Sequence, residues 1–416
     1  MFRASTHLLM NRNYLMSCLF FFFFFICWGA CYPYLSLWLT DTLGVDYSDV
    51  GLVYSFTAVV SVCIQPLFGF VSDRLRFRKN LMWMLAIIMV LFAPYWILVF
   101  APLMKYNVFL GALAGGIYIG FAFGAGCGVC EAYIDKVSRM SGFEFGRARM
   151  FGGLGAAFGT FMAGELYGIN QDYIFWMASL AGIALLAVVW LTRPEAPGAL
   201  AGPGGEARKI TLADVAELLK MRRFWFFALY MVGVGAVYET YDQQFAIYYS
   251  RFFATKAEGA AVFGYLYTAQ IFLDAVVMFF APWFVNKIGP KNALIYCGLI
   301  MSLRIVGSAY AVGPVSISAV KMLHGFESSV FLVAGLKYIG ANFNAAVSAT
   351  VYLIGFQFSK RFSEIFLSSV IGKMYSTLDF RDTYIILGVI ALGFTLISCV
   401  TLSSMRQPVV RNMVSG

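Results

Sequence analysis

Long apolar segments separated by short polar loops run along almost the whole chain. A membrane-spanning helix needs roughly 20 consecutive, mainly apolar residues, and twelve stretches meet this requirement. Transmembrane β-strands would instead show segments of about ten alternating residues. The pattern therefore predicts an all-α membrane protein with twelve transmembrane helices, over residues 14–39, 48–71, 80–103, 107–134, 147–168, 172–192, 223–249, 258–285, 291–312, 315–338, 346–372 and 382–404.

The composition supports an integral membrane protein. Of the 416 residues, 61% are hydrophobic and 12% are charged, whereas soluble domains average about 45–50% apolar and about 25% charged residues. The first segment contains "LFFFFFFICW", whose apolar run is too long for a signal peptide and lacks a small-residue cleavage pattern. We expect it to be retained as the first helix.

Basic residues alternate between the two sides of the predicted membrane segments. The net charge of +9 does not gather on one soluble face, so no nucleic-acid partner is expected. The loops on the other side hold few basic residues, namely Lys105, Arg251, Lys256 and Arg381. Cytoplasmic loops of membrane proteins are enriched in Lys and Arg, so we expect the basic side and both termini in the cytoplasm. The loops of the basic side hold Arg74, Arg76, Arg78, Lys79, Lys136, Arg139, Arg147, Arg208, Lys209, Lys220, Arg222, Arg223, Lys287 and Lys291.

A segment rich in Pro, Gly and Ala interrupts the pattern at 193–222, and such composition is typical of a linker. Six predicted helices precede it and six follow, which predicts two six-helix bundles, 1–192 and 223–416, joined by a cytoplasmic central loop. "DRLRFR" at 73–78 is echoed by "NKIGPK" at 286–291. A role in topology alone would explain either basic loop, but their recurrence favours an internal repeat. Repeats of this kind are typical of transporters, whose substrate sites lie between the repeats near the bilayer midplane.

Two predicted helices carry glycines at regular spacing, in "GALAGGIYIGFAFGAG" at 111–126 and "GGLGAAFGTFMAG" at 152–164. Small residues let helix backbones approach closely within a membrane. We expect these faces to form tight helix–helix contacts.

Ionisable residues occur inside the predicted spans. Each costs about 2.5–3.5 kcal/mol at the bilayer centre on insertion scales, so these residues must face one another or a wet cavity. Ionisable residues in such positions are candidates for function. They are Glu131, Arg149, Glu239, Asp242, Asp274, Arg304, Lys321, His324, Glu327 and Lys360.

Lys321, His324 and Glu327 follow one another at three-residue spacing, which makes them neighbours on a helix surface. A carboxyl group in apolar surroundings retains its proton more readily, and Phe326 and Phe331 flank Glu327. We predict that Glu327 carries the transported proton, that an approach of Arg304 expels it, and that His324 orients a substrate or links it to the proton site. The alternative is a set of ion pairs that only hold helices together.

Glu131 and Arg149 lie on successive predicted helices joined by a short loop. Guanidinium and carboxylate groups bind hydroxyl pairs with planar, directional hydrogen bonds, so this pair suits a polyol. Trp28, Tyr133 and Tyr238 offer aromatic faces for a sugar ring, although aromatic residues in membrane helices commonly serve packing or the interfacial belt.

Two further carboxylates, Glu239 and Asp242, need cations inside the predicted bundle. Lys360 and Arg304 are the obvious partners. A pair between Lys360 and Glu364, four residues apart, is the alternative for that lysine.

No pattern predicts a cofactor, a metal site or an enzyme. Cys127 and Cys130 form a CxxC, but zinc requires about four ligands and no further Cys or His lies nearby in sequence. We interpret the two cysteines as small packing residues. A nucleophile–base pair and a phosphate-binding glycine loop are also absent from the sequence, so the proton is the only coupling ion expected.

Several segments resemble the lactose permease family, the oligosaccharide:proton symporters of the major facilitator superfamily. They are "FFFFFFICWGACYP", "FEFGRARMFG", "YDQQFA", "VFGYLYTAQ", "LHGFE", "SATVYLIGFQ" and "LGFTLIS". The resemblance implies two helical bundles around a central cavity, alternating access, and proton-coupled import of a disaccharide or small oligosaccharide across a bacterial inner membrane. It also implies a monomer whose partners are the sugar, protons and the lipid bilayer.

The resemblance implies a role for each matching residue. Sugar binding falls to Glu131 and Arg149, and proton coupling or the sugar–proton link falls to Tyr238, Arg304, His324 and Glu327. It also implies the charge pairs Glu239–Lys360 and Asp242–Lys321, and a gating loop that contains Asp73 and Arg74.

The chain departs from the family pattern at several positions. Ala156 stands where lactose-type members carry a tryptophan that stacks on the sugar, so stacking must come from elsewhere. Their acid in the eighth span falls at Ile271, and Asp274 lies one turn further along, as in the sucrose-transporting branch. The Glu239–Lys360 pair resembles the galactoside branch instead, so galactoside and sucrose both stay open. Ser329 stands where a proline usually follows the proton-carrying acid, and Arg76 replaces the second glycine of the loop.

Three other functions compete with sugar–proton symport. A passive sugar facilitator would not need Glu327, and a major facilitator carrier for a non-sugar substrate, such as an exporter of amphiphiles, would not need Glu131 and Arg149 together. A non-transporting sugar sensor would normally need an output domain.

Overall fold

The computed structural model describes residues 12–75, 79–192, 218–343, 348 and 350–404, and leaves out the side chains of 65–75 and 139. Helices make up nearly all of this part of the chain. The first half contains α2 (Arg12–Cys31), η1 (Tyr32–Tyr34), α3 (Leu35–Thr42), α4 (Tyr47–Leu75), α5 (Asn80–Val90), α6 (Phe92–Tyr95), η2 (Trp96–Phe100), α7 (Ala101–Tyr106), α8 (Val108–Ile119), η3 (Gly120–Ala125), α9 (Gly126–Ser141), α10 (Phe145–Ile169) and α11 (Tyr173–Leu191).

The second half contains α13 (Arg222–Tyr230), η4 (Met231–Gly235), α14 (Ala236–Gln243), α15 (Phe245–Ser250), α16 (Lys256–Ile288), α17 (Pro290–Ala309), α18 (Pro314–Met322), α19 (His324–Asn342), η5 (Val351–Phe358) and α21 (Ser359–Thr401). The all-α prediction is thus confirmed over the described residues. Most of the expected linker lies outside them, so the domain boundaries stay a prediction.

Each of the twelve predicted segments falls on a helical stretch. Within the described residues, eight helices are long and apolar enough to cross a membrane, and a ninth span arises if Asn80–Tyr106, bent by 56°, counts as one. The helices α10 and α13–α15 do not meet this criterion. One of the eight, Val351–Thr401, is bent at Asp379, where φ is 67°, and so covers two predicted segments. The twelve-helix count is consistent with this arrangement.

Local chemistry explains several helix ends. Asn107 Oδ1 accepts a hydrogen bond from the Leu110 amide at 3.0 Å at the start of α8, and Thr255 Oγ1 accepts from Glu258 at the start of α16. Each side chain satisfies an amide that the first helical turn leaves without a partner. Gly142 ends α9 with a φ of 70°, in the left-handed region that glycine enters at little cost.

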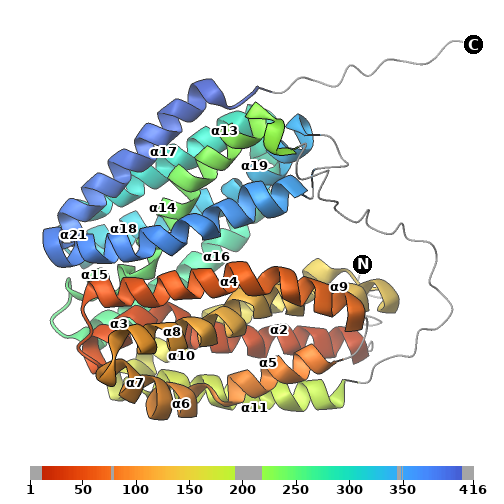
Figure 1. The fold of residues 1–416 in the computed structure, drawn as a ribbon, viewed down its shortest axis with the longest axis vertical. Coiled ribbons are helices and arrows are strands. Elements are labelled where there is room, and N and C mark those ends of the chain that lie inside the picture. The colour runs from red at the N-terminus through yellow and green to blue at the C-terminus, as the bar shows by residue number, and fades with distance from the viewer. Residues whose placement is uncertain (1–11, 76–78, 193–217, 344–347, 349, 405–416) are drawn as a thin grey trace, which may run out of the picture.

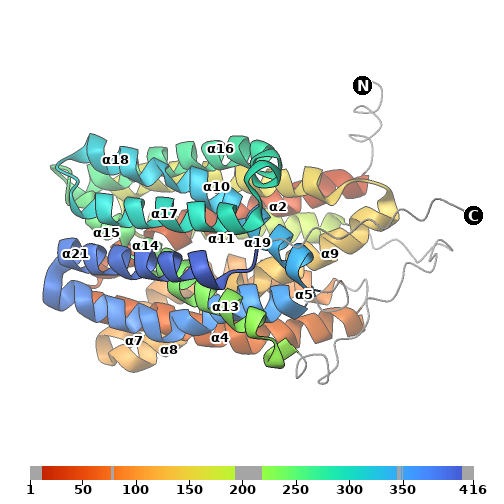
Figure 2. The same ribbon diagram turned by 90° about the horizontal axis from the view of Figure 1, so that it is seen from above.

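The helices form two groups that follow the order of the chain (Figure 1). Helices from α2 to α11 make one group, and helices from α13 to α21 make the other. A view turned by 90° shows that the helices of both groups run in broadly the same direction (Figure 2). The groups meet where α4 packs against α21 and α10 packs against α16.

Hydrogen bonds between the two groups gather toward one end of the helices, where α21 turns back at Asp379 (Figure 1). Ser376 donates to Asp46 at 2.5 Å, Gln244 donates to the Tyr47 carbonyl at 3.0 Å, and Lys256 donates to Asp41. The loops at this end are those that carry few basic residues. We call this end of the molecule the closed end.

Glycines bring α2 and α10 together, as their spacing predicts. A Cβ atom added to Gly155 would lie 2.2 Å from the Phe22 carbonyl oxygen, and one added to Gly159 would lie 2.6 Å from the Ile26 carbonyl oxygen. Backbone atoms cannot yield as a side chain can, so only glycine fits these two positions.

Gly155→Ala is expected to destabilise the protein by about 1–3 kcal/mol, the usual cost of overpacking a tight interface. Gly153→Ala in the same helix is the matched control, because no atom lies within 4 Å of a Cβ atom added there. Thermal unfolding in detergent should show a lower midpoint for Gly155→Ala and an unchanged or higher one for Gly153→Ala. Equal midpoints would contradict this account of the α2–α10 contact.

Candidate functional site

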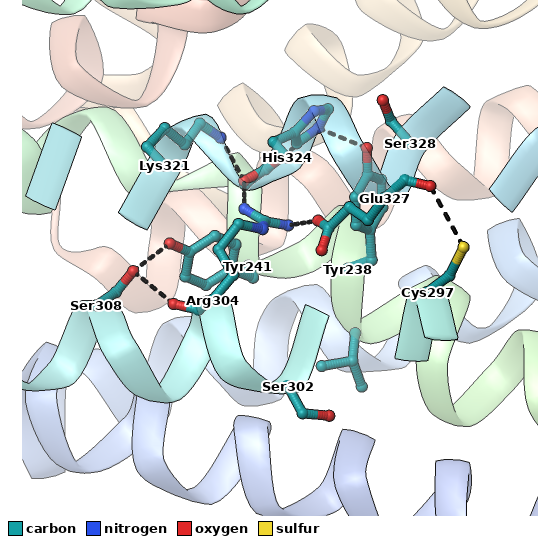
Figure 3. A network of polar contacts seen from close by, with 12 residues as sticks. Tyr238, Tyr241, Cys297, Ser302, Arg304, Ser308, Lys321, His324, Glu327 and Ser328 are labelled. Atoms are coloured by element: carbon teal, nitrogen blue, oxygen red, sulfur yellow. Dashed lines mark hydrogen bonds and ion pairs between the residues drawn. The ribbon is translucent and has the colours of Figure 1, made fainter. Parts of the chain in front are cut away.

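Arg304 of α17 lies at the centre of a charged network in the second group (Figure 3). It is fully buried. Its Nη2 atom lies 2.6 Å from Glu327 Oε1, and its Nη1 atom lies 3.1 Å from Asp242 Oδ1. The ring of Tyr241 faces the guanidinium, with 4.6 Å between Arg304 Cζ and the ring centroid. Three helices, α14, α17 and α19, therefore meet at one guanidinium.

Two further side chains contact Asp242. Lys321 Nζ, at the end of α18, lies 2.7 Å from Asp242 Oδ1, and His324 Nε2 lies 3.3 Å from Asp242 Oδ2. The Lys321 side chain is 2% exposed and that of Asp242 is 25% exposed, so Asp242 is the most exposed of these five residues. The Lys321, His324 and Glu327 side chains, predicted as neighbours, all join the Asp242–Arg304 pair.

His324 links this network to Tyr238 and α16. Its Nε2 atom lies 2.5 Å from the Tyr238 hydroxyl, and its Nδ1 atom lies 3.0 Å from Gln270 Nε2. Tyr238 and Gln270 therefore contact opposite nitrogens of the His324 ring. The sequence analysis did not single out Gln270. A polar residue one turn before Asp274 on a predicted helix is the signal that would have found it.

Asp274 lies at the edge of the same cluster. It accepts a hydrogen bond from Ser328 Oγ at 2.8 Å, and its Oδ2 atom lies 3.8 Å from His324 Nδ1. Ser329 stands where the family usually carries a proline. Its Oγ atom donates a hydrogen bond to the Asp274 backbone carbonyl at 2.9 Å and so connects α19 to α16. The structure therefore places Asp274 beside His324.

A second cluster forms around the start of α21. Lys360 Nζ lies 2.5 Å from Glu239 Oε1, whereas Arg361 Nη1 lies 2.7 Å from Glu364 Oε2. The alternative pair between Lys360 and Glu364 is therefore wrong, because Arg361 takes Glu364 and leaves the lysine for Glu239. Arg304 contacts Asp242 and Glu327. The sequence analysis also missed Arg361, a charged residue next to Lys360 and three residues before Glu364.

The first group also holds an ion pair between two of the predicted site residues. Arg149 Nε lies 2.8 Å from Glu131 Oε1, with the two side chains 34% and 39% exposed. Phe25 supports the guanidinium, whose Cζ atom lies 4.2 Å from the ring centroid. Cys127 Sγ lies 3.7 Å from Glu131 Oε1, and Cys130 is buried. Within the described residues, no group of three or more metal-ligating side chains comes together.

Aromatic rings lie between the two groups. Trp28 stacks on Tyr32 with ring centroids 5.6 Å apart and lies 6.4 Å from Tyr267 of α16. Ala156, at the position where the family's tryptophan would stand, is buried. A Cβ atom added to Gly29 would lie 2.5 Å from the Ala156 carbonyl oxygen, so α2 lies directly against this position. Trp28 of α2 and Tyr32 of η1 therefore supply aromatic surface next to Ala156.

The expected gating residues lie at the end of a helix. Asp73 and Arg74 belong to the last turn of α4, which ends at Leu75, because no glycine or proline follows 71 to break the helix there. Their side chains and residues 76–78 lie outside the described part of the chain, so their gating role stays a prediction.

Taken together, the site offers two separated polar regions. Glu131 and Arg149 present a carboxylate and a guanidinium to the space between the groups, which suits hydroxyl-bearing molecules. The Arg304 network holds a carboxylate, Glu327, away from water and within reach of a positive charge. Such a carboxylate is suited to gain and lose a proton as its partner moves.

Comparisons with known proteins agree with this geometry. Residues 6–415 match the family model described as LacY proton/sugar symporter. The chain is 44% identical to the melibiose permease of Enterobacter cloacae, covering 95% of this chain and 94% of the relative. It is 44% identical to the raffinose permease of Escherichia coli, covering 96% and 95%, and 32% identical to the sucrose permease of Escherichia coli, covering 96% of each.

Solved structures share the fold at low identity. The nucleoside transporter NupG aligns with a TM-score of 0.78 at 17% identity, covering 94% of this chain and 99% of NupG. A D-xylose–proton symporter aligns with a TM-score of 0.67 at 14% identity, covering 95% and 98%. These likenesses confirm the predicted major facilitator fold, and the family match excludes an enzyme. The chain belongs to the family of LacY proton/sugar symporters.

Proposed function

We propose that this protein imports a disaccharide or small oligosaccharide together with a proton, by alternating access. The observation that carries the proposal is the buried Arg304–Glu327 contact of 2.6 Å, joined through Asp242 and His324 to the space between the helix groups. The names of the related melibiose, raffinose and sucrose permeases support a galactoside or sucrose as the sugar.

The proposed membrane is the bacterial inner membrane, with both termini in the cytoplasm and the protein acting as a monomer. The basic loops support this orientation, because they lie at the end of the helices opposite the closed end. The closed end then faces outward, where hydrogen bonds hold the two helix groups together.

Glu327 is proposed to carry the proton. Burial favours the neutral carboxylic acid, and a guanidinium close to the carboxylate favours the anion. Both effects act on Glu327, so a small movement of Arg304 relative to Glu327 shifts the balance between them. His324, which contacts Asp242, would link a bound sugar to this pair.

The proton gradient supplies enough free energy for concentrative uptake. One elementary charge moving through 100 mV is worth about 2.3 kcal/mol, and a tenfold concentration ratio corresponds to about 1.4 kcal/mol. One proton per sugar therefore supports roughly fifty-fold accumulation.

Purified protein in proteoliposomes should take up protons when a transported sugar is added. A pH electrode outside the vesicles measures the alkalinisation, and lactose, melibiose, raffinose, maltose and sucrose form the panel of sugars. A protonophore should abolish the signal. Labelled sugar that enters with no proton movement would defeat the coupling.

Glu327→Ala is expected to retain sugar exchange across the membrane and to lose uphill accumulation entirely, because the proton carrier is removed while Glu131 and Arg149 remain. Glu258→Ala, at an exposed acid in the first turn of α16, is the matched control and should accumulate sugar normally. Labelled-sugar uptake with and without a pH gradient separates the two activities. Accumulation that persists in Glu327→Ala would contradict its role.

A further inference from the structure

A buried ion pair in α21 takes no part in the Arg304 network. Arg361 Nη1 and Glu364 Oε2 lie 2.7 Å apart, with the arginine side chain 31% exposed and the glutamate side chain 2% exposed. Both residues come from a single helix at i and i+3. The pair therefore joins no two helices, and a buried ion pair is in general weak support for stability.

The position of the pair is fixed by the packing of α21 on α4. Ser368 lies one turn beyond Glu364, and its carbonyl oxygen lies 2.2 Å from a Cβ atom added to Gly51. Ser369 Oγ and Ser55 Oγ lie 2.8 Å apart. Residues four apart share one face of a helix, so Glu364 faces the first group.

The same space holds the Glu131–Arg149 pair. Tyr32 interacts electrostatically with Arg361 and Glu364, and Cys127, which contacts Glu131, interacts with both Arg149 and Arg361. The two arginine–glutamate pairs therefore come near each other from opposite helix groups, with Arg361 close to both Tyr32 and Cys127.

Glu364 has an unused acceptor. Its Oε1 atom is buried and has no hydrogen-bond partner within the described residues, although leaving such an atom unpaired costs about 1–3 kcal/mol or more. Arg361 is one third exposed and has five N–H donors in total. A sugar hydroxyl can both donate and accept a hydrogen bond. The free Glu364 oxygen could therefore accept from one hydroxyl while the Arg361 guanidinium donates to its neighbour.

We propose that Arg361 and Glu364 form a second hydroxyl-binding pair, which holds the sugar unit that lies away from Glu131 and Arg149. The inference rests on the proposed function and deepens it, because it names the residues that hold the second sugar unit. One pair on each helix group then lets a single oligosaccharide bridge the groups.

The test compares whole sugars with their parts. Equilibrium exchange in proteoliposomes, without any gradient, gives a half-saturating concentration for melibiose, raffinose and sucrose, and for methyl α-galactoside and methyl α-glucoside. The double variant Arg361→Met/Glu364→Met removes the charges and keeps the side-chain volume. We expect a roughly 10- to 100-fold higher half-saturating concentration for each oligosaccharide that the unmodified chain carries, as for hydrogen bonds to charged groups.

The half-saturating concentrations of the single-ring glycosides should change by less than about twofold in the double variant. These glycosides lack the second sugar unit, so they form no hydrogen bonds with Arg361 and Glu364 that could be lost. Glu144→Met/Arg147→Met is the matched control, because this pair is also spaced i and i+3 but is exposed, with 3.2 Å between Arg147 Nε and Glu144 Oε2. It should leave all values unchanged.

Unchanged oligosaccharide values, or an equal weakening of the single-ring glycosides, would overturn the inference. If the double variant does not fold, Glu364→Gln decides, and it should raise the oligosaccharide values in the same selective way. An unmodified chain that exchanges none of these sugars would instead defeat the proposed function itself.

Discussion

A charge that cannot face lipid must find another charge, and this constraint organises the second half of the molecule. Arg304 is fully buried, so its guanidinium requires the carboxylates of Glu327 and Asp242. Those contacts fix α14, α17 and α19 relative to one another, and Lys321 adds α18 through Asp242. The packing of four helices thus follows from the need to neutralise one side chain.

The two helix groups divide the chemistry unequally. The first group presents the Glu131–Arg149 pair, whose glutamate side chain is 39% exposed. The second group holds the deeply buried network and the Lys360 and Arg361 pairs. The more exposed pair suits a guest that enters and leaves, and the buried carboxylate suits a proton, which needs no wide path. The proposed proton site therefore lies on one group, whereas the proposed sugar contacts come from both.

Much of this was predictable from the sequence, because burying a charge in a membrane is costly wherever the helix happens to pack. The contacts of Arg304 and Glu327 follow from that rule, whereas the helical segments and the glycine contacts of α10 follow from the apolar runs and the spacing of small residues. The partner of Glu364 did not follow, since Glu364 lies within one turn of both Lys360 and Arg361. Gln270 was also missed, because burying a neutral amide costs less than burying a charge, and only its place one turn before Asp274 points to it.

The seam at the closed end has a consequence for how the carrier cycles. Its contacts between the groups are short polar bonds, such as Ser376 to Asp46 and Ser55 to Ser369, together with glycines pressed against backbone. Water replaces polar bonds of this kind almost without loss, so parting the seam trades one set of hydrogen bonds for another. Separating the helix groups at the closed end therefore costs little free energy, and the binding of a sugar is enough to offset that cost.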